Sequence, residues 1–296
     1  RVGLEAEVSK GCIPGIYRVD YKVQGNPKVS IVIPNKDGKD ILKVCIDSIL
    51  SKTTYQNYEI VIVENNSTTE EIFEYYKELE KNERIIVTTY PNKGFNYSAI
   101  INHGAKNSTG DYIVQLNNDT ELVTENWLEL MLGFCQRDDV GGVGVKLYYP
   151  DETIQHAGII VGIGGIAGNR FKSIPKAGHA YFAMESMINN LSAVTAACMM
   201  NPRKVYDEVG FMEEKLAVAF NDVDFCLKVR EKGYLIVYNP YVEFIHYESK
   251  SRGQEDTPEK IKRFQGEIST FEQRWGNFLD EGDPYYNINL SLDTEV

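Results

Sequence analysis

The stretch KVSIVIPNKD, from Lys28 to Asp37, decides the fold. Its β-branched run Val29–Ile33 is halted by Pro34, which is typical of a short buried strand. Directly after it, residues 40–51 place their apolar side chains on one helical face. A strand followed closely by an amphipathic helix is the repeating unit of α/β proteins.

The alternation of strand and helix continues as far as residue 120. The hydrophobic pattern predicts strands at 59–63, 84–89 and 111–116, and helices at 69–81 and 96–107. Strands that alternate with helices pair in parallel through right-handed crossovers. Residues 28–120 are therefore predicted to form an α/β half that binds a nucleotide.

The rest of the chain has a less regular pattern, which indicates a mixed arrangement. Residues 153–180 are rich in Gly and are expected to form a loop or hairpin insertion. Around that insertion, the pattern predicts helices at 125–136, 203–209, 222–232 and 258–275, and strands at 140–147, 192–200, 234–238 and 242–246. The predicted bounds are 1–27 for a lead-in segment, 28–250 for the main domain with its second half at 121–250, and 251–296 for a C-terminal helix and tail packed on that domain.

Composition and charge narrow the class of protein. The formal net charge of -12 repels nucleic acid, so we expect no nucleic-acid partner. The five cysteines are scattered and form no CxxC pair, which favours a reducing, cytoplasmic setting. The apolar stretch 157–168 is too short to cross a bilayer. The chain begins with Arg1 rather than Met, which fits a module cut from a larger polypeptide.

Three polar turns follow predicted strands directly. They are Pro34–Asp37, Glu64–Ser67 and Asn117–Asp119. Each alone is compatible with a helix cap or an Asx-turn. However, ligands of open α/β sheets bind beyond the carboxyl ends of the strands, and three such turns at one sheet edge indicate a binding site.

These motifs resemble those of family 2 glycosyltransferases. Val61–Ser67 (VIVENNS) is similar to the nucleoside-binding turn of that family, and Gly110–Asp119 (GDYIVQLNND) to the strand leading into its DxD motif. Asn92–Asn96 (NKGFN), followed by Asn102–Ala105 (NHGA), is similar to its NxGfxxAxNxG segment. Phe220–Leu227 (FNDVDFCL) is similar to the start of the ED-containing helix of that family. The resemblance covers residues 28–246 in the right order, and it implies a GT-A fold: a Rossmann-like, mostly parallel central sheet flanked by helices, with a mixed acceptor-side half.

The resemblance implies a divalent metal, Mn²⁺ or Mg²⁺, that neutralises the charge of a diphosphate leaving group. Asp119 and His246 are the expected metal ligands. A buried strand histidine with a satisfied hydrogen bond is the alternative interpretation of His246. Asn117 departs from the family because the first position of DxD is normally an acid.

The implied donor is a UDP- or dTDP-sugar. Glu64 occupies the position of a family acid that accepts the ring N–H of the pyrimidine. Asp37 is expected to hold the base or ribose, or else to serve its own turn. Lys93 is a candidate for a diphosphate contact. The full set of expected donor-binding residues is Pro34, Asp37, Glu64, Asn66, Lys93, Gly94, Asn117 and Asn118.

Asp222 is the expected general base, which would remove the proton of an acceptor hydroxyl while an inverting displacement proceeds. Asp222 and Asp224 also fit acids favoured by the dipole of a helix N-terminus. Asn221 replaces the Glu of the usual ED pair, and Asp224 is expected to support the acceptor side. His156, in the segment Gln155–Gly158 (QHAG), is a further acceptor-side candidate on a mobile or purely structural loop.

The leading interpretation is an inverting, metal-dependent transferase of bacterial polysaccharide or glycoprotein glycan synthesis. Its acceptor would be a glycan, lipid-linked or protein-linked. Such an acceptor is compatible with peripheral contact at the inner face of the membrane. A module of a larger transferase and a homo-oligomer both fit the sequence. Two alternatives stay open: a catalytically degenerate module that binds nucleotide-sugar or glycan, favoured by Asn117 and Asn221, and a sugar nucleotidyltransferase, whose Gly-rich basic signature Pro34–Asp37 lacks.

Overall fold

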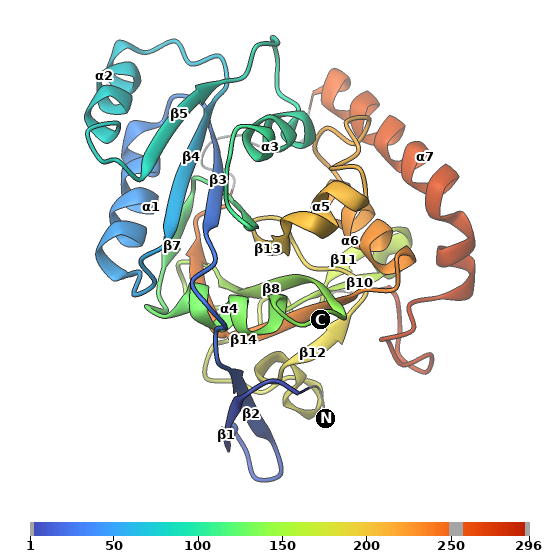
Figure 1. The fold of residues 1–296 in the computed structure, drawn as a ribbon. Coiled ribbons are helices and arrows are strands. Elements are labelled where there is room, and N and C mark those ends of the chain that lie inside the picture. Colours follow the sequence, from blue (N-terminus) through green and yellow to red (C-terminus); the bar gives the residue numbers. More distant parts are fainter. Residues whose placement is uncertain (1–2, 249–256, 294–296) are drawn as a thin grey trace.

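The computed structural model describes residues 3–248 and 257–293. Its first half contains the predicted parallel sheet (Figure 1). The strands β3 (Val29–Asn35), β4 (Tyr58–Glu64), β5 (Ile85–Thr89) and β6 (Tyr112–Leu116) lie in the order β6-β3-β4-β5, and every neighbouring pair is parallel. The helices between them are α1 (Lys39–Lys52), α2 (Glu70–Leu79) and α3 (Tyr97–Lys106). The predicted α/β alternation is therefore confirmed.

The second half adds strands of both directions to the same sheet. Beyond β6 come β13 (Cys198–Pro202), β8 (Val140–Tyr148), β14 (Leu235–His246) and β12 (Asn189–Leu191). Only the β8–β14 pair is parallel among these neighbours. Two short strands, β7 (Thr120–Leu122) and β9 (Ile154–His156), complete a ten-stranded sheet by pairing with β14 and β8. One mixed sheet thus runs through both predicted halves.

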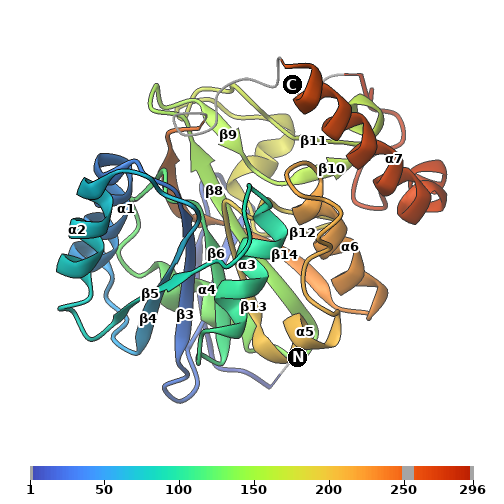
Figure 2. The ribbon, with the colours of Figure 1, turned by 90° about the horizontal axis from the view of Figure 1, so that it is seen from above.

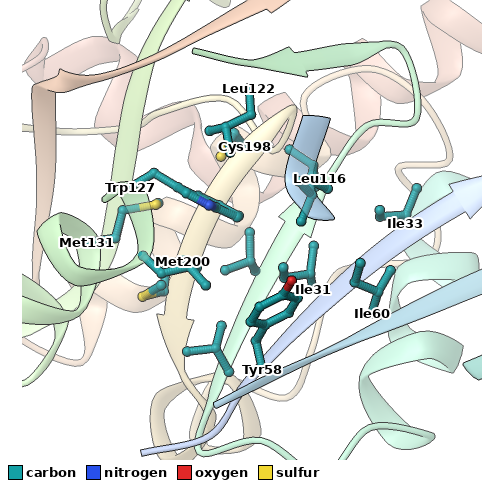
Figure 3. Packing of buried hydrophobic residues seen from close by; sticks show 14 of the residues in the cluster. Ile31, Ile33, Tyr58, Ile60, Leu116, Leu122, Trp127, Met131, Cys198 and Met200 are labelled. Carbon is teal, nitrogen blue, oxygen red and sulfur yellow. The ribbon is translucent and has the colours of Figure 1, made fainter. Parts of the chain in front are cut away.

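Helices cover both faces of the sheet (Figure 2). On one face lie α1, α2 and α4 (Trp127–Cys135), and on the other lie α3, α5 (Arg203–Glu208), α6 (Asn221–Glu231) and α7 (Pro258–Glu281). Successive strand residues alternate between the two cores, because side chains of a strand point to opposite faces. Ile31 and Ile33 belong to the core that includes α1, part of which Figure 3 shows, and Val32 packs toward α3.

Helix α3 lies unusually close to β3 and β4. A Cβ at Gly104 would come within 2.3 Å of Val32 and 2.7 Å of Val63. Any larger residue would therefore push α3 off the sheet. The close contact matters for the site because α3 begins at the carboxyl ends of these strands.

Both ends of the described chain hold more structure than their patterns predicted. The lead-in segment contains an antiparallel hairpin of β1 (Ala6–Lys10) and β2 (Tyr17–Tyr21), which projects from the body in Figure 1. The C-terminal helix α7 extends the predicted helix 258–275 to Glu281. It packs against the sheet face that carries α6, through Phe271 and Trp275. The predicted boundary at residue 250 lies outside the described residues.

Two other predictions of secondary structure need correction. The strand predicted at 192–200 is wrong over 192–197, where the chain crosses the end of the sheet before β13 begins. The two strands predicted at 234–238 and 242–246 form the single strand β14, which has a shift in its register with β8 between Asn239 and Glu243. The Gly-rich segment 153–180, predicted to be a loop or hairpin insertion, holds β9 and a hairpin of β10 (Ile159–Val161) and β11 (Ala167–Asn169). No helix among the described residues is long and apolar enough to cross a membrane.

Candidate active site

The three polar turns meet at one edge of the sheet and are joined by hydrogen bonds. Asn118 Nδ2 donates to Asn35 Oδ1 (2.6 Å), and Asn35 Nδ2 donates to the Tyr76 hydroxyl (2.7 Å). Tyr76 in turn donates to Glu64 Oε2 (3.0 Å). This series of hydrogen bonds connects the ends of β6, β3 and β4, and the side chains of Asn35, Tyr76 and Glu64 in it are buried. It fixes the turns relative to one another.

Asp119 and His246 form a close pair beside these turns. The register of β14 with β7 sets His246 opposite Thr120, and the amide of Tyr247 donates to the Asp119 carbonyl (2.8 Å). His246 Nε2 lies 3.0 Å from Asp119 Oδ1, and both side chains are buried. Residues that lie far apart in sequence are thus held together by one strand pairing.

Gln155 fixes the orientation of the His246 ring. Gln155 Nε2 donates to Glu248 Oε2 (2.9 Å), so its Oε1 faces His246 Nδ1 at 2.7 Å. An amide oxygen only accepts, which assigns the proton to Nδ1 and directs Nε2 toward Asp119. The sequence placed Gln155 in a loop without a partner, and no local pattern relates residues from β9 and β14.

Asp222 lies in the first turn of α6. Its carboxylate accepts hydrogen bonds from the amides of Ala196 (3.2 Å) and Val223 (2.9 Å). Burial raises the pKa of Asp222, and these hydrogen bonds oppose that rise. Phe220, two residues before Asp222, has a φ of 61°, and its ring packs on Phe264 and Phe271 of α7. Helix α7 therefore holds the start of α6.

A single cleft of about 440 Å³ brings many of these groups together. Six of the residues expected from the sequence line it: Pro34, Asn117, Asn118, Asp119, Asp222 and His246. Others line it that the sequence did not single out as ligands: Asn35, Lys36, Asn65, Phe95, Tyr97, Ile100, Thr195, Ala196, Ala197, Val218, Asn221 and Glu248. Several of these residues belong to motifs already noted. The motifs therefore predicted the position of the cleft more accurately than they predicted which side chains line it.

Two of the expected donor-binding acids accept hydrogen bonds from the turn after β4. Glu64 accepts from the amide of Ser67 (2.7 Å) and from Tyr76, and its side chain is buried. Asp37 Oδ1 accepts from the amides of Thr68 (2.7 Å) and Thr69 (3.0 Å) at the start of α2. Desolvation raises the pKa of Asp37, but these hydrogen bonds outweigh it, and the pKa lies below its ordinary value. Neither side chain lines the cleft.

Two more of the expected donor-binding residues, Lys93 and Gly94, lie in the loop after β5, and a third, Asn66, lies in the turn after β4. Asn66 Nδ2 donates to the carbonyl of Asn92 (2.9 Å) and so fixes this loop to the turn after β4. Lys93 is exposed, and Gly94 takes a φ of 89°. None of the three lines the cleft, whereas Lys36 does. Lys36 is therefore the cation better placed to meet a diphosphate.

The two acceptor-side candidates lie beneath the cleft. His156 is buried, with Nδ1 2.6 Å from Asn169 Oδ1 and Nε2 accepting from the amide of Thr195 (3.4 Å). Burial lowers the pKa of His156 to about 4, so the ring is neutral and supports the segment that crosses the end of the sheet. Asp224 is fully buried and accepts from Arg274 (2.6 Å) and Trp275 (2.8 Å), which anchors α7. Neither side chain contacts the cleft directly.

The side chains of Asp119 and His246 are suitable ligands for a divalent cation. A carboxylate from Asp119 and an imidazole nitrogen from His246 converge at the cleft, and both are ligands that Mn²⁺ accepts. The described residues contain no group of three or more His, Cys, Asp or Glu side chains that could hold a metal. A cation held by two protein ligands is completed by phosphate oxygens and water, as is usual for metals bound together with nucleotides.

Comparison with known proteins places the chain in a family. A family model described as glycosyl transferase family 2 matches residues 30–210. An uncharacterised protein of Sinorhizobium fredii, y4gI, is 42% identical over 98% of this chain and 32% of its own length. The O-antigen biosynthesis protein RfbC of Myxococcus xanthus is 37% identical over 99% of this chain and 22% of its own length. The chain spans a third or less of these relatives.

Two solved structures share the fold at 14% sequence identity. A mannosyltransferase from Pyrobaculum calidifontis, in complex with GDP-Man and Mn²⁺, has a TM-score of 0.60 and covers 86% of this chain and 65% of its own. GalNAc-T7 with UDP, GalNAc and Mn²⁺ has a TM-score of 0.64 and covers 86% of this chain and 50% of its own. The chain is a glycosyltransferase domain that belongs to glycosyl transferase family 2 and has the GT-A fold.

Proposed function

We propose that the chain transfers a sugar from a UDP- or dTDP-sugar to a glycan hydroxyl, with inversion at the anomeric carbon and with a bound divalent metal. The observation that carries this proposal is the presence of the Asp119–His246 pair and Asp222 on one cleft. The Asp119–His246 pair would supply ligands for a cation, and Asp222 would supply a carboxylate near the expected acceptor. Family membership argues against the sugar nucleotidyltransferase alternative.

The donor would bind across the carboxyl ends of β3, β4 and β6. Asn65, Asn117 and Asn118 offer amide groups to the ribose or base, and Lys36 offers a positive charge to the diphosphate. We retain Pro34, Asp37, Glu64, Asn66, Lys93 and Gly94 as proposed donor-side residues in a supporting role. Asp37, Glu64 and Asn66 hold the turns that shape the base site. Glu64 accepts within the turn after β4, Asp37 joins the turn after β3 to it, and Asn66 joins it to the loop after β5.

In the transfer step, Asp222 would accept the proton of the acceptor hydroxyl as its oxygen bonds to the anomeric carbon and the bond to the diphosphate breaks. The amides of Ala196 and Val223 fix the carboxylate for this task. A divalent cation, when bound, would neutralise the charge of the departing diphosphate. Asp119 and His246 would hold that cation, with the imidazole oriented by Gln155.

The relative RfbC, which is named for O-antigen biosynthesis, supports a proposal for the biological setting. We propose that this domain acts in the synthesis of a bacterial surface polysaccharide or glycan, as one module of a longer transferase. Its acceptor would be a lipid-linked or protein-linked glycan, reached through peripheral contact at the inner face of the membrane. His156 and Asp224 would serve the acceptor side from below, by supporting residues 195–197 and α6.

The experiment that tests this function is a transfer assay with Mn²⁺. Purified chain is incubated with UDP- and dTDP-hexoses and a panel of methyl glycosides, and the products are read by NMR. We expect one donor class to yield a glycoside whose anomeric configuration is opposite to that of the donor. A product of retained configuration would contradict the inverting mechanism, and turnover of neither donor class would contradict the proposed donors.

Gln155→Met tests the orientation of His246. Methionine keeps the length of the side chain but removes the oxygen that accepts from Nδ1, so the ring loses its fixed direction. We expect the affinity for Mn²⁺ in the presence of nucleotide to fall by about 10–100-fold, the usual effect of losing a hydrogen-bond partner of a metal ligand. Electron paramagnetic resonance of free Mn²⁺ measures that affinity.

The matched control for this variant is Gln273→Met, which alters an exposed glutamine of α7. Its Mn²⁺ affinity should equal that of the wild type. If Gln155→Met also binds Mn²⁺ as tightly as the wild type, Gln155 does not position a metal ligand.

A further inference from the structure

The wall of the cleft has polar and apolar parts. Asn and Lys side chains, with Asp119 and His246, lie at the ends of β3, β4, β6 and β14. The apolar wall is formed by Phe95, Tyr97, Ile100, Ala196, Ala197 and Val218. Asp222 borders this apolar wall, because the amide of Ala196 donates to its carboxylate. The proposed general base therefore lies beside apolar residues, together with the polar Thr195 and Asn221.

Phe95 is exposed over 46% of its surface although it lines this wall. Other exposed phenylalanines, such as Phe73 and Phe182, do not line the cleft. Burial of a phenylalanine side chain stabilises a protein relative to exposure, and Phe95 gives up part of that stabilisation. Its ring is available to an apolar surface that enters the cleft.

The backbone on both sides of Phe95 is held in place. Asn66 Nδ2 donates to the carbonyl of Asn92 (2.9 Å), and Asn96 Nδ2 donates to the carbonyl of Glu214 (2.8 Å). The Asn96 side chain also accepts from the amide of Ala99 (3.0 Å) and so caps α3. These contacts preorganise Phe95, which reduces the entropy lost when a ligand packs on it.

Val218 is held next to this segment from the other side. The amide of Tyr97 donates to the carbonyl of Ala217 (2.7 Å), so the two segments run side by side. Glu267 of α7 is buried and accepts from the amides of Val218 (2.8 Å) and Ala219 (3.3 Å). Helix α7 thus fixes the apolar rim as well as the start of α6.

We propose that Phe95 and Val218 form an acceptor subsite that takes the apolar face of a pyranose ring and presents one of its hydroxyls to Asp222. The C–H groups on one face of a pyranose make that face apolar, and an exposed aromatic ring packs against such a surface. A hydroxyl at the edge of the stacked ring would be free to reach the carboxylate of Asp222, which lines the same cleft as Phe95 and Val218. The subsite rests on the proposed transferase function and names its acceptor class.

Phe95→Ala tests the subsite, with Phe95→Tyr as the conservative variant and Phe182→Ala as the control. Saturation-transfer NMR on protein loaded with diamagnetic Mg²⁺ and UDP or dTDP detects the binding of methyl glucoside, galactoside and rhamnoside. We expect wild type and Phe95→Tyr to saturate the C–H protons of one sugar face. Phe95→Ala should bind the same glycoside about tenfold more weakly, with unchanged nucleotide affinity, and Phe182→Ala should behave as wild type.

Two results would overturn the subsite. One is the absence of saturation transfer from the wild type to every glycoside of the panel, and the other is equal glycoside affinity in wild type and Phe95→Ala. A loss of nucleotide affinity in Phe95→Ala would instead assign the ring to the donor. Failure of the proposed function appears separately, as wild-type protein that neither binds nucleotide nor consumes a nucleotide-sugar.

Discussion

Asp222→Asn is expected to reduce the rate of transfer by about 10²–10⁴-fold, the usual contribution of a general base. The amide keeps the shape of the side chain but does not accept the hydroxyl proton. Nucleotide affinity should stay close to that of the wild type, since Asp222 borders the apolar wall of the cleft rather than lying at the strand ends. Initial rates and calorimetric nucleotide titrations measure the two properties.

The dependence on pH gives a second signature of the same group. A general base acts when deprotonated, and burial raises the pKa of Asp222 above the ordinary carboxylate value. As the pH falls, kcat/KM should therefore decline at a higher pH than for an ordinary carboxylate. Asp222→Asn should lack this acid limb.

Asp207→Asn is the matched control, because Asp207 is an exposed acid of α5 outside the cleft. It should leave both the rate and the pH profile unchanged. If Asp222→Asn instead loses nucleotide affinity and transfer together, Asp222 belongs to the donor site and another group removes the proton.

Asp119→Asn is expected to weaken Mn²⁺-dependent nucleotide binding by more than about 100-fold. Loss of an outer partner of a metal ligand already costs about 10–100-fold, and this substitution removes the charge of a ligand itself. The amide still fits beside His246, so the fold should be preserved. Calorimetry with and without Mn²⁺ measures the effect.

The control for this variant is Asp47→Asn, which alters an exposed acid of α1 paired with Lys43. It should bind nucleotide as the wild type does. Unchanged Mn²⁺ dependence in Asp119→Asn would exclude Asp119 as a ligand, and His246 alone would then be an insufficient site.

The sequence predicted the edge of the sheet where the cleft lies, because strand ends are local features. Val29–Ile33 followed by Pro34, and Tyr112–Leu116 followed by Asn117, each carry their own signal. The pattern does not show whether an oxygen at such a turn faces a ligand or its own backbone. Asp37 and Glu64 resemble ligand-binding acids in sequence. However, Glu64 accepts a hydrogen bond within its own turn, and Asp37 accepts one from the neighbouring turn after β4.

Contacts between distant residues could not be read from local patterns. Gln155 meets His246 only because β9 and β14 both pair with β8. Asp224 binds Arg274 and Trp275 only because α7 packs beside α6. Since this contact is not visible in the sequence, the acid at the start of a helix was expected to support the acceptor side. The family resemblance supplied His246 as a candidate, and the register of β14 with β7 explains its position. The functional roles of these residues stay predictions.

The most direct test of the central claim is a calorimetric titration of the 296-residue chain with UDP and dTDP, each with and without Mn²⁺. GDP serves as the comparison nucleotide. We expect UDP or dTDP to bind in the presence of Mn²⁺, and we expect this binding to be lost when the metal is removed. Binding of equal strength without Mn²⁺, or no binding of either pyrimidine nucleotide by folded protein, would contradict it.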